Sequence, residues 1–145
     1  MARSPQIEAA ESMARGIEIK NGPVSGAVFF RYRVPYFPPP RSAATAPWKG
    51  RDALDGVMLM DAGMAQYREH MTPTMRAQRT ITNGGKQPNV VPKTAAIWWY
   101  FRDPSADGAL KLFDQAKKIA EGAALMTNTE WSVDVLSAVW PTRGN

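Results

Sequence analysis

The chain has 145 residues, which is enough for one ordinary domain and too few for two domains with separate cores. Its composition, 44% hydrophobic and 21% charged, is that of a globular protein and argues against disorder throughout. The absence of cysteine excludes a disulfide framework and a cysteine nucleophile. With one histidine, His70, a self-contained metal cage or catalytic triad is disfavoured, so we predict no catalytic and no metal-binding residue in this chain.

Charge and hydropathy predict a cytoplasmic protein. No apolar run approaches the ~20 residues that span a bilayer, and the N-terminus lacks the apolar centre of a signal peptide. The net charge of +5 lies entirely in residues 1–51, which hold eight Lys or Arg against three Glu, whereas the remainder holds ten of each sign. A nucleic-acid footprint normally spreads over a folded face, so we interpret this excess as a solvated N-terminal segment.

The first third of the chain predicts an arm, a strand and a loop. Residues 1–23 are weakly amphipathic and end at an Asn-Gly-Pro turn signal, which indicates an N-terminal arm or helix. Residues 24–34 alternate in the period of a half-buried strand. One face of this strand carries Val28, Phe30, Tyr32 and Val34. Prolines then indicate a loop over residues 35–40.

The middle of the chain predicts a helix and two strands. After Pro47 a helix of about 20 residues is indicated by apolar spacings of three and four, with Asp52 and Asp55 at its positive N-terminal end. Its stripe comprises Val57, Met60, Met64, Tyr67 and Met71, and we interpret the methionines, Met58 included, as core packing. Strands follow at residues 74–82 and 93–102, separated by a turn and a loop.

A second helix and a last strand complete the pattern. Asp103 is predicted to cap the helix, with Pro104 in its first turn, and Asn128 to stop it in a left-handed conformation. The buried stripe comprises Leu112, Ala116, Ile119, Ala123 and Met126. With a strand at residues 129–139, the order βαββαβ predicts an α+β, ferredoxin-like fold, in which a four-stranded antiparallel sheet carries both helices on one face.

Four segments resemble the dimerisation, or lid, domain of zinc exopeptidases and aminoacylases, most closely the aminobenzoyl-glutamate hydrolase type of amidohydrolase. They are Trp-Lys-Gly-Arg-Asp-Ala-Leu-Asp-Gly at 48–56, Arg-Glu-His at 68–70, Asn-Gly-Gly-Lys-Gln-Pro-Asn-Val-Val-Pro at 83–92 and Ala-Glu-Gly-Ala-Ala at 120–124. The resemblance covers roughly residues 24–145. It implies a lid domain at 24–139 and a truncated linker toward the catalytic half at 140–145.

The resemblance also implies what this chain lacks. In the family the zinc ligands and the general-base glutamate lie outside the lid, so the chain is expected to hold no cofactor and to be inactive alone. The parent enzyme would be a zinc-dependent homodimer that hydrolyses N-acyl or aminobenzoyl amino-acid amides or peptides. The family has a histidine that reaches the partner subunit's site, but Ser42 stands at that position here. Residues 35–41 also depart from the family, which suggests the hypothesis of a local reading-frame slip.

The family's lid contributes to substrate binding, and the resemblance transfers this role to Asn89 and Arg102, with Gly84 and Gly85 in the same loop. An arginine fork suits a carboxylate because it donates two parallel hydrogen bonds, and an asparagine amide adds a neutral donor. We expect the two side chains to converge at one rim of the sheet. The structural interpretation is that Asn89 caps a turn and Arg102 is a solvated strand end.

Two other functions remain open: a stand-alone homodimerising interaction module and a basic RNA-binding domain. The run Trp98-Trp99-Tyr100 suggests base stacking on a sheet. However, alternation places Trp99 on the opposite face from the other two, and no RNA-binding segment of the Arg-Gly-Phe-Gly-Phe-Val kind occurs. The sequence therefore disfavours nucleic acid as a partner.

Overall fold

The structure, a computed structural model, describes residues 24–35 and 47–139. The expected N-terminal arm, most of the proline-rich loop and residues 140–145 lie outside this part. The strands are β1 (Val24–Arg33), β2 (Arg76–Asn83), β3 (Thr94–Asp103) and β4 (Glu130–Val139), and the helices are α2 (Ala53–Tyr67) and α3 (Ala106–Thr127). Two single-turn helices, η1 (Pro47–Lys49) and η2 (Arg68–His70), flank α2.

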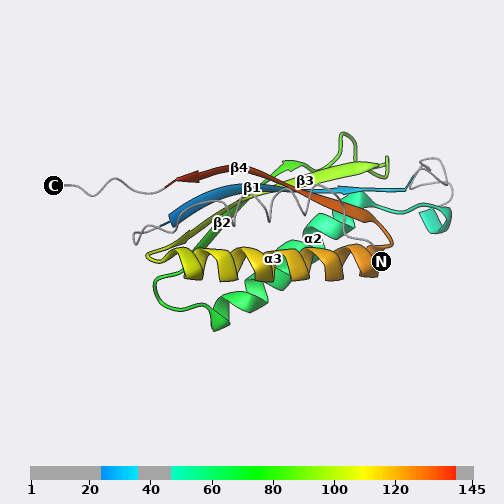
Figure 1. The fold of residues 1–145 in the computed structure, drawn as a ribbon. Helices are drawn as coiled ribbons and strands as arrows, with labels where there is room; N and C mark the ends of the chain where they lie inside the picture. Colours follow the sequence, from blue (N-terminus) through cyan, green and yellow to red (C-terminus); the bar gives the residue numbers. More distant parts are fainter. Residues whose placement is uncertain (1–23, 36–46, 140–145) are drawn as a thin grey trace.

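The predicted ferredoxin-like fold is confirmed. The four strands form one sheet in the order β2-β3-β1-β4, and every neighbouring pair is antiparallel. Both helices lie against one face of the sheet, which leaves the opposite face uncovered by described residues (Figure 1). Neither helix of the described part is both long and apolar enough to cross a membrane.

The core lies between the sheet and the helices, as the strand periodicity predicts. The largest side chains in it are Trp99, Tyr32, Phe30, Phe101, Met60 and Met64. Tyr32 is buried with its hydroxyl because Oη donates a hydrogen bond to the Ala120 carbonyl of α3 at 3.1 Å. Gly56 leaves room for the Tyr32 ring beside α2, since a Cβ at this position would collide with the ring.

The first helix is shorter than predicted. It ends at Tyr67, and the expected last turn is the 3-10 turn η2 instead. One reason lies in Arg68, whose Nη2 donates to the Ala77 carbonyl of β2 at 2.9 Å and so ties this turn to the sheet. Pro73 follows closely, and the residue before a proline avoids helical backbone angles.

The start of the second helix also differs from the prediction. Asp103 is the last residue of β3, and the cap of α3 is Ser105, whose Oγ accepts from the Gly108 amide at 3.1 Å. The Asp103 carboxylate instead accepts hydrogen bonds from the amide and hydroxyl of Ser105, both at 2.8 Å. The predicted stop is confirmed, because Asn128 has φ 54° in the left-handed region.

Two methionines assigned to the core are exposed. Met58 is 51% exposed because it lies one helix position off the buried stripe of α2. Met126 is 65% exposed because the last turn of α3 borders an open hollow that no described element fills. The rest of both stripes is buried or half-buried.

Candidate functional site

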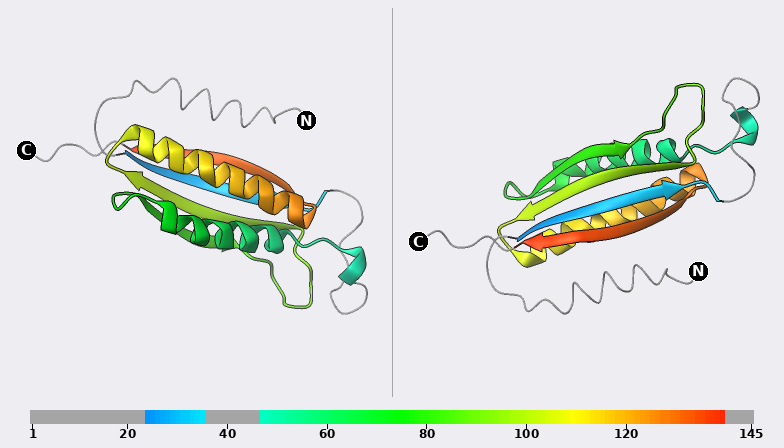
Figure 2. Two further views of the ribbon diagram at one scale, coloured as in Figure 1. Left: turned by 90° about the horizontal axis from the view of Figure 1, so that it is seen from below. Right: turned by 90° about the horizontal axis from the view of Figure 1, so that it is seen from above.

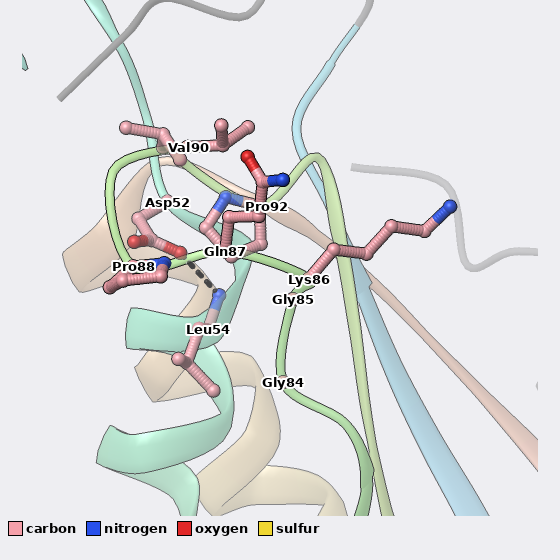
Figure 3. Close-up of a pocket in the computed structure, with 10 residues that line it drawn as sticks. Asp52, Leu54, Gly84, Gly85, Lys86, Gln87, Pro88, Val90 and Pro92 are labelled. Carbon is pink, nitrogen blue, oxygen red and sulfur yellow. Dashed lines mark hydrogen bonds between the residues drawn. The ribbon is translucent and has the colours of Figure 1, made fainter.

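The loop between β2 and β3 encloses a pocket against the start of α2. The pocket has a volume of about 330 Å³ and is lined by Asp52, Leu54, Gly84–Pro88 and Val90–Pro92. In Figure 3 the Lys86 side chain extends away from the loop, whereas Asp52, the residue before α2, and Leu54 in its first turn line the pocket on the side of the helix. A larger hollow of about 690 Å³ shares Asp52 and Val91 and continues along α2 to the last turn of α3.

The two loop glycines have different physical requirements. Gly85 has φ +100°, a backbone angle that side chains rarely adopt, and a Cβ there would lie 2.7 Å from Pro92 Cγ. At Gly84 a Cβ would meet only ordinary contacts, at 3.6 Å from Ile81 and 3.7 Å from Leu54. The shape of the loop therefore depends on Gly85.

Hydrogen bonds fix both ends of this loop. The side chain of Asn83 accepts from the Gly85 amide at 3.2 Å and donates to the Thr94 carbonyl at 3.1 Å. At the other end, the Pro92 carbonyl accepts from the Ala53 amide at 3.0 Å, and Asp52 caps α2 through the Leu54 amide at 2.7 Å. The turn-capping role that the structural interpretation gave Asn89 thus belongs to Asn83.

The structure does not bring Asn89 and Arg102 together within one chain, and the expected convergence is wrong. Asn89 lies in the loop before β3, whereas Arg102 lies near its end, eight residues beyond Thr94. At about 3.3 Å per residue, those eight residues span roughly 26 Å. Figure 2 shows the loop at one end of the sheet and the tip of the β3 arrow at the other.

Both side chains are nevertheless available. Asn89 and Arg102 are exposed, and neither side chain forms a hydrogen bond or ion pair with another described residue. The Arg102 guanidinium lies over the Tyr100 ring, 5.3 Å from its centroid. Arg76 of β2 stands directly opposite Arg102 in the sheet, a pairing that the sequence alone did not reveal because it depends on the register between β2 and β3.

The pKa of one carboxylate that lines the larger hollow is raised by burial and by a neighbouring charge. Burial, followed by the negative charge of Asp52, raises the pKa of Asp55 above its usual value of 3.8. Among the described residues no cluster of three or more His, Cys, Asp or Glu side chains could hold a metal ion. His70 lies at the end of η2, with its ring 6.3 Å from that of Tyr67.

The fold resembles that of large amidase and peptidase chains. An aminobenzoyl-glutamate utilization protein from Klebsiella pneumoniae aligns with a TM-score of 0.67 and 20% identity, over 83% of this chain and 30% of that one. A hydantoinase/carbamoylase family amidase from Burkholderia ambifaria gives a TM-score of 0.70 at 13% identity, over 84% of this chain and 29% of that one. At these identities the likeness shows the fold alone.

Curated relatives define the family more closely. The chain is 44% identical over 88 residues to a p-aminobenzoyl-glutamate hydrolase subunit of Escherichia coli (strain K12), covering 60% of this chain and 18% of the relative. It is 36% identical over 104 residues to the Xaa-Arg dipeptidase of Mus musculus, covering 72% of this chain and 24% of the relative. No protein-family model matches. The chain corresponds to a partial domain of this amidohydrolase and peptidase family and spans about a fifth to a quarter of the length of these relatives.

Proposed function

We propose that residues 24–139 are the dimerisation (lid) domain of a cytoplasmic, metal-dependent amidohydrolase that hydrolyses N-acyl or aminobenzoyl amino-acid amides or peptides. Zinc and the catalytic groups would belong to other parts of the enzyme, and this chain is inactive alone. The observation that carries the proposal is the identity of 44% and 36% to two hydrolases, over segments that cover 60% and 72% of this chain. The lid contributes dimer contacts and binds the substrate's carboxylate.

The separation of Asn89 and Arg102 supports a site built from two copies. The start of β1 and the end of β4 lie at the Arg102 end of the sheet, since Val24 pairs with Asp103 and Ser25 pairs with Val139. A catalytic domain joined there would adjoin Arg102, whereas Asn89 lies at the far tip. Antiparallel pairing of two β2 edges about a two-fold axis would place the tip of one copy beside Arg76 and Arg102 of the other.

The edge strand β2 is suited to this pairing. All of its residues except Ala77 are exposed, and an open edge presents unpaired backbone groups to another strand. Ile81 on this strand is 42% exposed, and Leu59 on the adjacent α2 adds a second exposed apolar side chain. The partner of this domain is therefore a second copy of the same chain.

A chimeric enzyme tests the proposed function. Residues 24–139 would replace the matching segment of the E. coli hydrolase, with Ser42→His restoring the histidine that the family has at that position. We expect hydrolysis of p-aminobenzoyl-glutamate by the chimera and none by the present chain alone. Without Ser42→His, we expect slower turnover at similar KM. An intact, folded chimera that leaves this substrate unhydrolysed in both forms would contradict the proposal.

Variants of the chimera then test the two binding residues. Arg102→Ala should reduce kcat/KM by about 2–4 kcal/mol of transition-state binding, and Arg102→Lys should not restore it because an ammonium lacks the bidentate fork. Asn89→Ala should cost roughly 1–3 kcal/mol, as loss of a neutral donor does. Mixed dimers in which one chain carries Asn89→Ala and the other Arg102→Ala should keep one intact site. If each variant alone has full kcat/KM, the assignment of these residues is wrong.

A further inference from the structure

The face of the sheet opposite the helices, here called the open face, carries a band of aromatic rings. Phe29 of β1 and Trp98 of β3 stand opposite each other and are stacked, with ring centroids 5.3 Å apart and planes 16° apart. Tyr100 continues the band along β3, 6.1 Å from Trp98. All three rings are half-buried rather than enclosed. We call Phe29, Trp98 and Tyr100 the aromatic band.

The aromatic band lies on the two central strands of the sheet. β3 and β1 occupy the middle of the order β2-β3-β1-β4, and no described residue covers them on this side, as the view from above shows (Figure 2, right). RNA-recognition domains with a four-stranded sheet stack two or three bases on aromatic side chains of that sheet. Alternation along β3 places only two rings on this face, and the register with β1 adds the third ring, Phe29.

Arginines surround the band. Arg31, Arg33, Arg76 and Arg102 share the open face by strand alternation and register. Arg31 and Arg33 form ion pairs with Asp134 and Glu130 of β4, respectively. Arg76 and Arg102 stand directly opposite each other, and neither forms an ion pair with a described residue. Arg76 Nη1 donates hydrogen bonds to the carbonyls of Pro73 and Met75, which leave its positive charge without an acidic partner. Like charges at opposed positions destabilise a sheet, and an anion between them would relieve the repulsion.

We propose that the open face binds single-stranded nucleic acid, with bases stacked on the aromatic band and backbone phosphates at Arg76 and Arg102. The guanidinium of Arg31 lies over the Phe29 ring at 5.5 Å and that of Arg102 over the Tyr100 ring at 5.3 Å. Each guanidinium covers one face of the ring beneath it, so a base at these two positions would stack on the guanidinium plane, which bases use as they use rings. A duplex, whose bases are already stacked and paired, cannot use this surface in the same way.

The test measures fluorescence anisotropy of a labelled RNA of about twelve nucleotides and mixed sequence, titrated with the 145-residue chain. The same sequence as single-stranded DNA and as an RNA duplex provides two further arms. We expect both single strands to bind and the duplex to bind at least about tenfold more weakly, because base stacking contributes to the first two only. Trp98→Ala should weaken single-strand binding about 5- to 100-fold, and Trp98→Phe should retain it.

Matched variants separate stacking and charge from general effects. Trp48→Ala removes an exposed tryptophan away from the sheet and should leave binding unchanged. Arg76→Gln should lower the slope of log K against log salt by about 0.7, the share of one phosphate contact on a single strand. Lys111→Gln, an exposed position on α3, should leave that slope unchanged.

Four results would overturn the proposal. They are no binding of either single strand at low salt, equal binding of the duplex, equal affinities for Trp98→Ala and Trp48→Ala, and a Trp98→Ala variant whose only change is its oligomeric state. The last result would assign the open face to a second copy of this chain. None of these outcomes is read from hydrolytic activity, so a failure of this proposal is distinguishable from a failure of the proposed function, although both use Arg102.

Discussion

At the scale of single residues, the structure depends on a few positions where backbone angle or burial leaves no alternative. Gly85 and Tyr32 are two of them. Gly85 holds the loop in a backbone conformation that a side chain would strain, and Tyr32 brings a hydroxyl into the core with a single acceptor. Residue type alone predicts neither requirement. Gly84, in the same loop, has no positive φ and room for a Cβ, and Tyr100, another tyrosine, lies half-buried on the open face.

The two glycines give a matched pair of variants. Gly85→Ala should lower the free energy of unfolding by ~1–3 kcal/mol, since it strains the backbone and forces Pro92 to move. Gly84→Ala should change it by less than about 0.5 kcal/mol. Urea unfolding of both variants measures the difference. Equal stabilities would show that the loop adapts freely to a side chain at position 85.

The hydroxyl of Tyr32 should give the stability a pH dependence in the alkaline range. Burial raises the pKa of Tyr32 above its usual 10.0 in the folded chain, whereas the unfolded chain ionises near that value. The folded state therefore binds more protons above pH 10, and stability should fall there by up to about 1.4 kcal/mol per pH unit. Chemical unfolding at several pH values measures this slope.

Tyr32→Phe provides the control for that slope. The variant loses the hydrogen bond to Ala120, at a cost of about 0.5–1.5 kcal/mol near neutral pH, but it also lacks the ionisable group. Its stability should fall less steeply above pH 10 than that of the parent chain. Identical alkaline slopes in both proteins would rule out Tyr32 as the source.

At the scale of elements, the sequence predicts which segments form helices and strands better than it predicts how they begin and end. The alternation of apolar residues in β1 and their spacing of three and four in α2 indicate directly which side chains are buried. Phe30 and Met60 are therefore correctly predicted to lie in the core. The junction between β3 and α3 is different, because Asp103, Ser105 and Asp107 are all acceptable caps by residue type. Only the extra length of β3, which ends at Asp103, makes Ser105 the cap.

The same limitation applies to the candidate site. The loop with Gly85 and Asn89 is recognisable in the sequence, but the distance from Asn89 to Arg102 depends on the direction of β3. A strand that follows a loop carries its last residues away from that loop, to the far end of the sheet. The expected convergence was wrong because it did not take the length of the strand into account. Likewise, Arg76 opposite Arg102 and Phe29 opposite Trp98 depend on register, which no single segment specifies.

The start of α3 provides a test at this scale. Ser105→Ala should cost ~0.5–2 kcal/mol of unfolding free energy, because it removes the acceptor of the Gly108 amide. Asp103→Ala should cost about 1–3 kcal/mol, since the Ser105 amide then loses its acceptor in a part-buried setting. Thermal unfolding measures both. If Ser105→Ala left the free energy of unfolding unchanged, Asp103, which the sequence predicts as the cap, would be the N-cap of α3 instead.

At the scale of the whole molecule, an open sheet has two edge strands with unpaired backbone groups and one uncovered face. A stable protein pairs, covers or charges such edges. The helices cover one face, the open face carries the aromatic band and the arginines, and the two edges are β2 and β4. Both edges bear exposed apolar side chains, Ile81 on β2 and Leu136 on β4. The proposed function distinguishes between them, because pairing through β2 sets the loop of one copy beside Arg102 of the other.

Substitutions on the two edges therefore predict different outcomes. We expect the chain to be a homodimer at tens of micromolar, the range in which a modest interface is populated. Ile81→Lys places a charge at the β2 edge and should give a monomer, since edge charges block strand pairing. Leu136→Lys introduces the same charge at the β4 edge and should leave the dimer intact. Sedimentation velocity of the three proteins measures the oligomeric state, and circular dichroism establishes that each protein is folded.

A monomeric parent chain at these concentrations would contradict the dimer, whereas loss of the dimer in Leu136→Lys alone would move the interface to β4. That second result would also remove the geometric reason for a site shared between Asn89 and Arg102, because pairing through β4 leaves the two residues on opposite sides of the assembly.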